Sequence, residues 1–174
     1  MLKKKNNIYG KQDWSKFKLR VNIGAKAMDA YARWITSAAL ESWFLRKAIF
    51  KDPQGNVRGK HEPVKPGDTY EWYWHGYPDT ISEKGKVLHA NGENKFGFTF
   101  SMGCPVTISL YTEAGETIVE LVESDLPIDE STALKHFVGD SRGWIFYLVN
   151  LKSVLEGGLD LRNKKEEITN VITS

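Results

Sequence analysis

Residues 143–158, GWIFYLVNLKSVLEGG, place six apolar or aromatic side chains in succession, from Trp144 to Val149, before the first polar residue. A helix on the surface of a globular protein buries one apolar stripe and exposes its other face to water. We therefore expect this segment to be a helix that is either buried on most of its circumference or has a special partner, and we expect Gly157 and Gly158 to end it. In the first case the rest of the chain must supply an apolar surface that covers it.

Alternation with a period of two residues, which is typical of strands, dominates the chain after Trp43. An earlier strand, FKLRVNI, begins at Phe17, and two short helices, AKAMDAYARWI and SAALESW, follow it. The later segments expected to form strands are FLRKAIFKD, DTYEWYWHG, ISEKGKVLHA, KFGFTFSM, VTISLYT and TIVELVES. Consecutive strands joined by short turns form an antiparallel meander.

The order of strand, two short helices, about six strands and a long helix predicts an α+β helix-grip fold, in which a curved antiparallel sheet wraps around the C-terminal helix. A short separate helix, STALKHFV, is expected before the long one. Ile145, Phe146 and Val149 lie off the stripe that faces the sheet, and we expect the short helices or the segment around Phe137 to cover them. The predicted stripe consists of Trp144, Tyr147, Leu148, Leu151, Val154 and Leu155.

Composition limits the class of protein. The formal net charge of the 174 residues is +2, which argues against nucleic acid as a partner, and no run of apolar residues is long enough for a membrane span. Cys104 is the single cysteine, so we expect no disulfide and a cytoplasmic location. We divide the chain into a flexible extension (1–14), one domain (15–163) and a polar tail (164–174).

Four segments carry a resemblance to a known family: AMDAYARWITSAALESWF, YEWYWHG, GKVLHANGENKFGFTF and GWIFYLVNLKSVLEGGLDLRN. They resemble bacterial proteins related to the C-terminal domain of the activator of the 90-kDa heat-shock protein ATPase, in the START-like (SRPBCC) superfamily. The resemblance covers roughly residues 17–163. It implies a helix-grip fold, often with an apolar cavity, and it connects the chain with proteins of the stress response.

Aromatic and apolar side chains of the predicted sheet and helix are the candidate lining of such a cavity. They are Tyr70, Trp72, Trp74, Phe96, Phe98, Phe100, Trp144, Leu148 and Leu151. Large aromatic residues fill packed cores and also line apolar ligand pockets, so both interpretations stay open. The indole nitrogens of Trp72 and Trp74 each need a hydrogen-bond acceptor.

Polar residues give weaker signals. Two interpretations of Glu71, His75 and Asp79 stay open: they form an acid–base or metal-binding group or, more simply, the solvated face of a strand. Arg46 and Glu120 have apolar neighbours, so an inward ion pair and an outward orientation both remain open. No metal-binding, nucleophile or phosphate-binding motif is present, and we expect no metal and no cofactor.

We expect the domain to bind a hydrophobic or amphipathic small molecule between its sheet and its C-terminal helix without catalysing a reaction. One alternative is a chaperone-associated interaction module with a packed core, and another is an enzyme of the cyclase or hydrolase type. A connected cavity would favour ligand binding, and an exposed apolar patch of several hundred Å² a protein partner. An inward-facing His or Glu would favour catalysis.

Overall fold

A computed structural model describes residues 13–128, 133–165, 167–168 and 171–172 of the chain. Within them, one seven-stranded antiparallel sheet has the order β1-β7-β6-β5-β4-β3-β2. The strands are β1 (Phe17–Ile23), β2 (Lys47–Lys51), β3 (Thr69–Tyr73), β4 (Glu83–Ala90), β5 (Lys95–Phe100), β6 (Cys104–Glu113) and β7 (Glu116–Glu123). The helices are α1 (Ala27–Ala32), α2 (Ser37–Glu41) and α3 (Ala133–Leu155).

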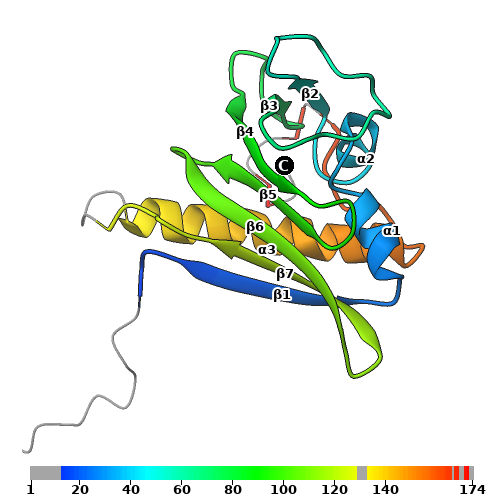
Figure 1. The fold of residues 1–174 in the computed structure, drawn as a ribbon. Coiled ribbons are helices and arrows are strands. Elements are labelled where there is room, and N and C mark those ends of the chain that lie inside the picture. The colour runs from blue at the N-terminus through cyan, green and yellow to red at the C-terminus, as the bar shows by residue number, and fades with distance from the viewer. Residues whose placement is uncertain (1–12, 129–132, 166, 169–170, 173–174) are drawn as a thin grey trace, which may run out of the picture.

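The sheet curves around α3, and α1 lies near the C-terminal end of that helix (Figure 1). The predicted helix-grip fold and element order are therefore confirmed. Polar bonds fix the end of α3 to the end of β1: Lys152 Nζ donates to the Asn22 carbonyl at 2.7 Å, and Gly24 N donates to Glu156 Oε1 at 2.7 Å.

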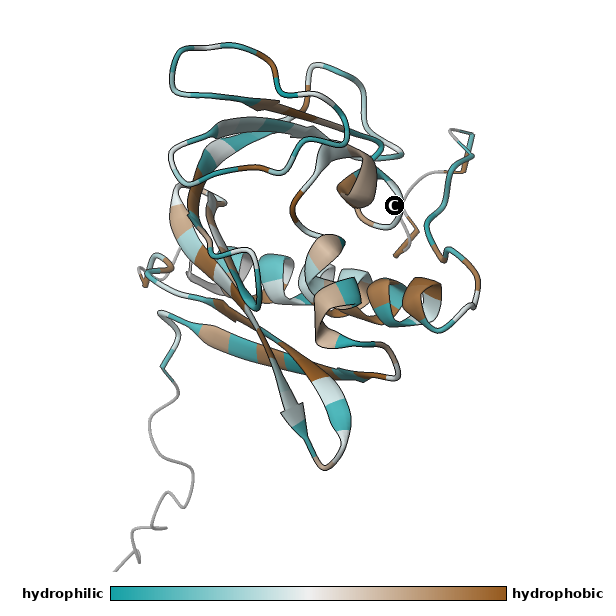
Figure 2. Cartoon of the chain, turned by 45° about the vertical axis from the view of Figure 1, so that its right-hand side comes forward, coloured by the Kyte–Doolittle hydropathy of each residue, from teal (hydrophilic) through white to brown (hydrophobic). Residues whose placement is uncertain are grey.

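The strands form where apolar and polar residues alternate, as the bands of Figure 2 show. In β6, Cys104, Val106, Ile108 and Leu110 are buried, and the residues between them are partly exposed. The β6–β7 hairpin turns through Ala114 and Gly115 at φ 50° and 84°. Positive φ at both central residues matches the twist of a two-residue hairpin, which explains the glycine.

One helix replaces two predicted ones. The segment STALKHFV does not form a separate short helix, because α3 runs without a break from Ala133 to Leu155 and includes its last six residues, while the first two lie outside the described residues. Gly139 and Gly143 lie inside this helix. Each costs only about 1 kcal/mol relative to alanine, which packing against the sheet can offset.

The stripe of α3 that faces the sheet is buried from Trp144 to Leu151 and partly buried at Val154 and Leu155, but the opposite face of the helix is exposed. Trp144, Leu148 and Leu151 are buried, whereas Ile145 is 50% exposed and Val149 is 48% exposed. The expectation that the short helices or the segment around Phe137 cover Ile145, Phe146 and Val149 was wrong for Ile145 and Val149, whereas Phe146 is partly buried against the core. The reason is positional: α1 packs on β6 and β7, and α2 packs on β2, so neither reaches the outer face of α3.

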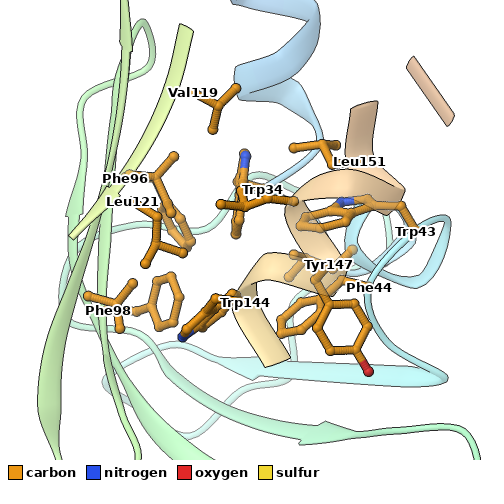
Figure 3. Close-up of a cluster of buried hydrophobic side chains, with 14 of the residues drawn as sticks. Trp34, Trp43, Phe44, Phe96, Phe98, Val119, Leu121, Trp144, Tyr147 and Leu151 are labelled. Atoms are coloured by element: carbon orange, nitrogen blue, oxygen red, sulfur yellow. The ribbon is translucent and has the colours of Figure 1, made fainter. Parts of the chain in front are cut away.

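Three aromatic residues from the segment around the short helices complete the core between sheet and helix (Figure 3). Trp34, Trp43 and Phe44 are almost fully buried. The rings of Trp34 and Trp43 meet edge to face at 4.7 Å, and Trp43 Nε1 donates to the Arg33 carbonyl at 2.9 Å. These side chains occupy much of the space that an open cavity would need.

The two ends of the predicted domain differ in how they join the core. Most of the predicted extension, residues 1–12, lies outside the described residues, while the Trp14 ring packs on Phe137 at 4.9 Å. At the other end Arg162 is buried and donates to the Leu45 carbonyl at 2.9 Å and to Asp160 Oδ2 at 2.6 Å. The chain therefore belongs to the core as far as Arg162.

Candidate functional site

Most of the predicted lining residues pack against one another. Four of them on β3 and β5 are buried: Tyr70, Trp72, Phe96 and Phe98. The Trp72 ring stacks on Tyr70, with ring centroids 3.9 Å apart, and meets Phe98 edge to face, with centroids 5.1 Å apart. Leu148 and Leu151 are buried against the same core. This part of the interior is filled by its own side chains.

A small pocket of about 110 Å³ lies beside this packed region, between the N-terminal half of α3 and the end of β5. It brings together three of the predicted residues, Trp74, Phe100 and Trp144. Its complete lining is Phe44, Trp74, Phe100, Gly139, Asp140, Gly143, Trp144 and Tyr147.

Aromatic rings form most of the pocket wall. The distance between ring centroids is 4.7 Å for Phe44 and Tyr147, 5.3 Å for Phe44 and Trp144, and 5.1 Å for Phe100 and Trp144. Trp74 contacts Phe44 at 6.0 Å, and Figure 3 shows Trp144 between Phe98 and Phe44. The contacts of Phe44 with Tyr147 and Trp74 are edge to face, and those of Trp144 with Phe44 and Phe100 are tilted, both of which are favourable arrangements of aromatic rings.

The pocket exists because α3 carries glycine where a side chain would fill it. Gly139 and Gly143 are four residues apart, so they lie on one helix face, and both line the pocket. A Cβ atom built at either position would meet no atom within 4 Å. Neither glycine is required by a close backbone approach, and each leaves open space.

Asn150 holds the opposite wall in place. Its side chain is fully buried, and Nδ2 donates to the Trp43 carbonyl at 2.6 Å while Oδ1 accepts from Leu161 N at 2.7 Å. These bonds join α3 to the segment that carries Phe44. The first polar residue after the apolar run of the helix is thus a structural anchor for the pocket.

An acidic side chain lies behind the aromatic wall. Glu123, at the end of β7, is fully buried, and its Oε2 accepts a hydrogen bond from Trp144 Nε1 at 2.9 Å. Its Oε1 has no hydrogen-bond partner in the described part of the chain. Burial, together with the charge of Asp140, raises the pKa of Glu123 to about 8, so this carboxyl holds a proton at neutral pH.

Two further carboxyl groups belong to the same cluster. Asp140 lines the pocket, and burial raises its pKa. Burial and the nearby Asp140 also raise the pKa of Glu83, at the start of β4. His136 lies beside Asp140, with 3.7 Å between Nδ1 and Asp140 Oδ2. Glu83, Glu123 and Asp140 are called the carboxyl cluster below.

The turn between β5 and β6 completes this region. Ser101, Met102 and Gly103 have φ values of 36°, 63° and 87°, so three consecutive residues adopt the left-handed region, which is costly for the two that carry a Cβ. Ser101 Oγ lies 3.1 Å from His136 Nδ1. The turn thereby joins the sheet to the N-terminal half of α3 next to Asp140.

The other polar candidates lie elsewhere. Glu71 pairs with Lys84 at 3.1 Å, and Asp79 pairs with Arg46. Glu120 points away from the core and lies 3.2 Å from Lys18. Among the residues that the structure describes, no group of three or more His, Cys, Asp or Glu side chains could hold a metal ion.

Glu123 and Asp140 were not identified from the sequence, although Glu123 left a signal. Val119 and Leu121 are buried on one face of β7, and the period of two places Glu123 on that same face. Asp140 left none, because its neighbours on α3 include two glycines rather than a recognisable apolar stripe. None of the described helices is both long and apolar enough to span a membrane.

No family model and no curated protein matches the chain. Solved structures do match. The Staphylococcus saprophyticus protein SSP2350 is 16% identical, with a TM-score of 0.66, over 84% of this chain and 96% of its own. DynU16, a putative protein from the dynemicin biosynthetic locus, is 17% identical, with a TM-score of 0.65, over 86% of this chain and 50% of its own.

Aha1 from Colwellia psychrerythraea, solved as a dimer, is 19% identical, with a TM-score of 0.61, over 82% of this chain and 97% of its own. At these identities the likeness concerns the fold alone. This chain is thus similar in fold, a curved sheet gripping a C-terminal helix, to proteins that include Aha1 and DynU16.

Proposed function

We propose that the domain binds a small molecule with an apolar body in the pocket between β5, Trp74 and α3, without catalysing a reaction. The supporting observation is the bare helix face at Gly139 and Gly143 opposite aromatic rings, in an interior that is otherwise filled. We also propose that the chain is a START-like relative of the heat-shock ATPase activator family. The buried thiol of Cys104 suits the reducing cytoplasm.

The size of the pocket limits the ligand. Pockets for drug-sized molecules measure roughly 300–1,000 Å³, whereas this one measures about 110 Å³. It has room for one ring or a compact alkyl group. A longer ligand must extend into solvent past Trp74, whose side chain is only partly buried.

A panel of small aromatic and aliphatic compounds tests this function by thermal unfolding and tryptophan fluorescence. A ligand that binds only the folded state raises its stability by about 2.7 kcal/mol at a hundredfold excess over Kd, which shifts Tm by roughly 5–10 °C. Gly143→Leu should abolish the shift by filling the pocket. Ile145→Ala, on the exposed outer face of the same helix, should leave the shift unchanged.

A shift that persists in Gly143→Leu would place the ligand elsewhere. If no compound shifts the transition, the small-molecule proposal fails.

The second candidate is a chaperone-associated interaction module, and a groove of about 730 Å³ favours it. The groove runs between the edge strand β1 and the outer face of α3, and its apolar lining includes Leu19, Val122 and Ile145. A 90-kDa heat-shock chaperone is the partner to test. We expect no increase in its ATP turnover; a several-fold increase that Ile145→Asp removes would favour this candidate over ligand binding.

A further inference from the structure

We propose that the pocket is selective for an organic cation, a protonated or quaternary ammonium group on a compact apolar body, which the carboxyl cluster attracts and the aromatic wall encloses. This inference rests on the ligand-binding function proposed above, and it adds the chemical class of the ligand.

The carboxyl cluster has no Lys or Arg partner among the described residues. Its three members come from β4, β7 and α3, and no Lys or Arg in the described residues forms an ion pair with any of them. The nearest basic group is His136, 3.7 Å from Asp140. Asp140 has the most demanding position, because it lines the pocket and its buried Oδ2 has no hydrogen-bond partner among the described residues. Acceptors buried in this way are expensive unless a donor or a positive charge satisfies them.

The aromatic wall determines which cation fits. A cation placed within about 6 Å of the face of Trp, Tyr or Phe is attracted by the ring, and aromatic cages are the usual receptors for alkylated ammonium groups. Phe44, Trp74, Phe100, Trp144 and Tyr147 all line the pocket. Asp140 is the one member of the cluster in that lining, so it is the carboxylate that a bound cation would contact.

A metal ion is a poor alternative occupant. Small hard cations need several oxygen ligands at short distances, and the described residues contain no such group of His, Cys, Asp or Glu. The pocket wall is carbon-rich apart from Asp140. An organic cation needs only one carboxylate and the ring faces, and both are present.

Isosteric probes of different charge test the inference by calorimetry on the full chain at pH 7.5. Benzylammonium carries a positive charge, benzyl alcohol is neutral and benzoate is negative, while their rings are the same. We expect benzylammonium to bind roughly tenfold or more tightly than benzyl alcohol, and benzoate to bind weakest. Asp140→Asn should bring the first two affinities together. Gly143→Leu should abolish binding of all three.

The outcomes separate this inference from the function on which it rests. Equal affinities for benzylammonium and benzyl alcohol, both lost in Gly143→Leu, would keep the pocket as a ligand site and overturn the preference for cations. No binding by any probe would overturn both. A preference for benzylammonium that survives Asp140→Asn would assign the selectivity to another part of the surface and overturn the inference.

The pH dependence gives a second readout, with tetramethylammonium as a probe whose charge does not titrate. Its affinity should rise severalfold from pH 6 to pH 8.5 as the carboxyl cluster ionises. The titratable groups around the cluster are His136 on α3, Tyr70 on β3, Cys104 on β6 and Asp125 after β7. Of these, His136 is the group that carries a positive charge when protonated, and loss of that charge changes affinity in the same direction.

His136→Gln removes that contribution and leaves the dependence on the carboxyl groups. A flat profile in this variant would contradict the inference. A rising profile would support the inference if binding also releases protons, as calorimetry in buffers of different ionisation enthalpy measures.

Discussion

Trp144 on α3 donates its indole hydrogen to Oε2 of Glu123 on β7 at 2.9 Å, with both side chains buried. This bond ties the helix to the strand at the point where the pocket and the packed core meet. It also keeps a carboxyl group in a place that disfavours its charged form.

The first prediction follows from this carboxyl group. The pKa of Glu123 rises from 4.5 to about 8 on folding, so between those values the folded protein holds a proton that the unfolded chain has released. Stability should therefore fall as pH rises from about 5 to 8, with at most about 1.4 kcal/mol per pH unit from this group. Denaturation by urea at several pH values measures the slope.

Glu123→Gln keeps an acceptor for Trp144 and removes the titration, so its slope should be shallower; Asp140 and Glu83 still contribute in the same direction. Identical slopes for the two proteins would mean that Glu123 ionises normally.

The second prediction concerns the grip on α3. Leu151 is fully buried between the helix and the sheet, so Leu151→Ala should cost about 2–5 kcal/mol in the free energy of unfolding. Val149→Ala on the same helix removes a half-exposed side chain and should cost no more than about 1 kcal/mol. Chemical denaturation of both variants compares them, and a cost under about 0.5 kcal/mol for Leu151→Ala would contradict the packing described.

The third prediction compares two glycines. A Cβ at Gly85 in β4 would lie 2.6 Å from the Thr99 carbonyl oxygen and from the Tyr70 hydroxyl. Because backbone limits the room for relief, Gly85→Ala should destabilise by roughly 1–3 kcal/mol. Gly139→Ala meets no atom within 4 Å and improves helix propensity, so it should stabilise by about 0.5–1 kcal/mol. Thermal unfolding of both variants gives the comparison, and equal shifts in Tm would refute it.

The fourth prediction tests the C-terminal limit of the domain. Arg162 donates to the carbonyls of Leu45 and Glu41 and pairs with Asp160. A chain ending at residue 161 should therefore unfold at a Tm several degrees lower than one ending at 163, because about 2 kcal/mol or more is lost with these bonds. If the two chains have the same Tm, the bonds of Arg162 contribute nothing to the stability of the core.

The fold could be predicted from the sequence because its signals are periodic. The alternation in β5 and β6 and the apolar stripe of α3 report which face of each element is inward, and those faces suffice for a helix-grip architecture. The unbroken length of α3 could not be predicted, because Gly139 and Gly143 weaken the helical signal where tertiary packing keeps the helix intact.

The free space left in the interior, unlike the fold, could not be predicted from the spacing of residues. Trp72 and Phe98 share an inward face, as their spacing indicates, but whether space remains beside them depends on Trp34 and Trp43, which come from a distant part of the chain. The orientation of Glu123 was readable from Val119 and Leu121. That no Lys or Arg among the described residues pairs with Glu123 could not be predicted, because this property depends on which strands meet around it.

The edge-to-face pair of Trp34 and Trp43 also has an optical consequence. Two indole rings held 4.7 Å apart at 73° have coupled electronic transitions, and the fixed angle between them makes that coupling chiral. The folded domain should thus carry its own near-ultraviolet circular dichroism marker, set by a contact between the turns that follow α1 and α2 rather than by the pocket. Loss of that marker reports unfolding, whereas a change in tryptophan emission at constant circular dichroism reports an event near Trp74 or Trp144 in the pocket.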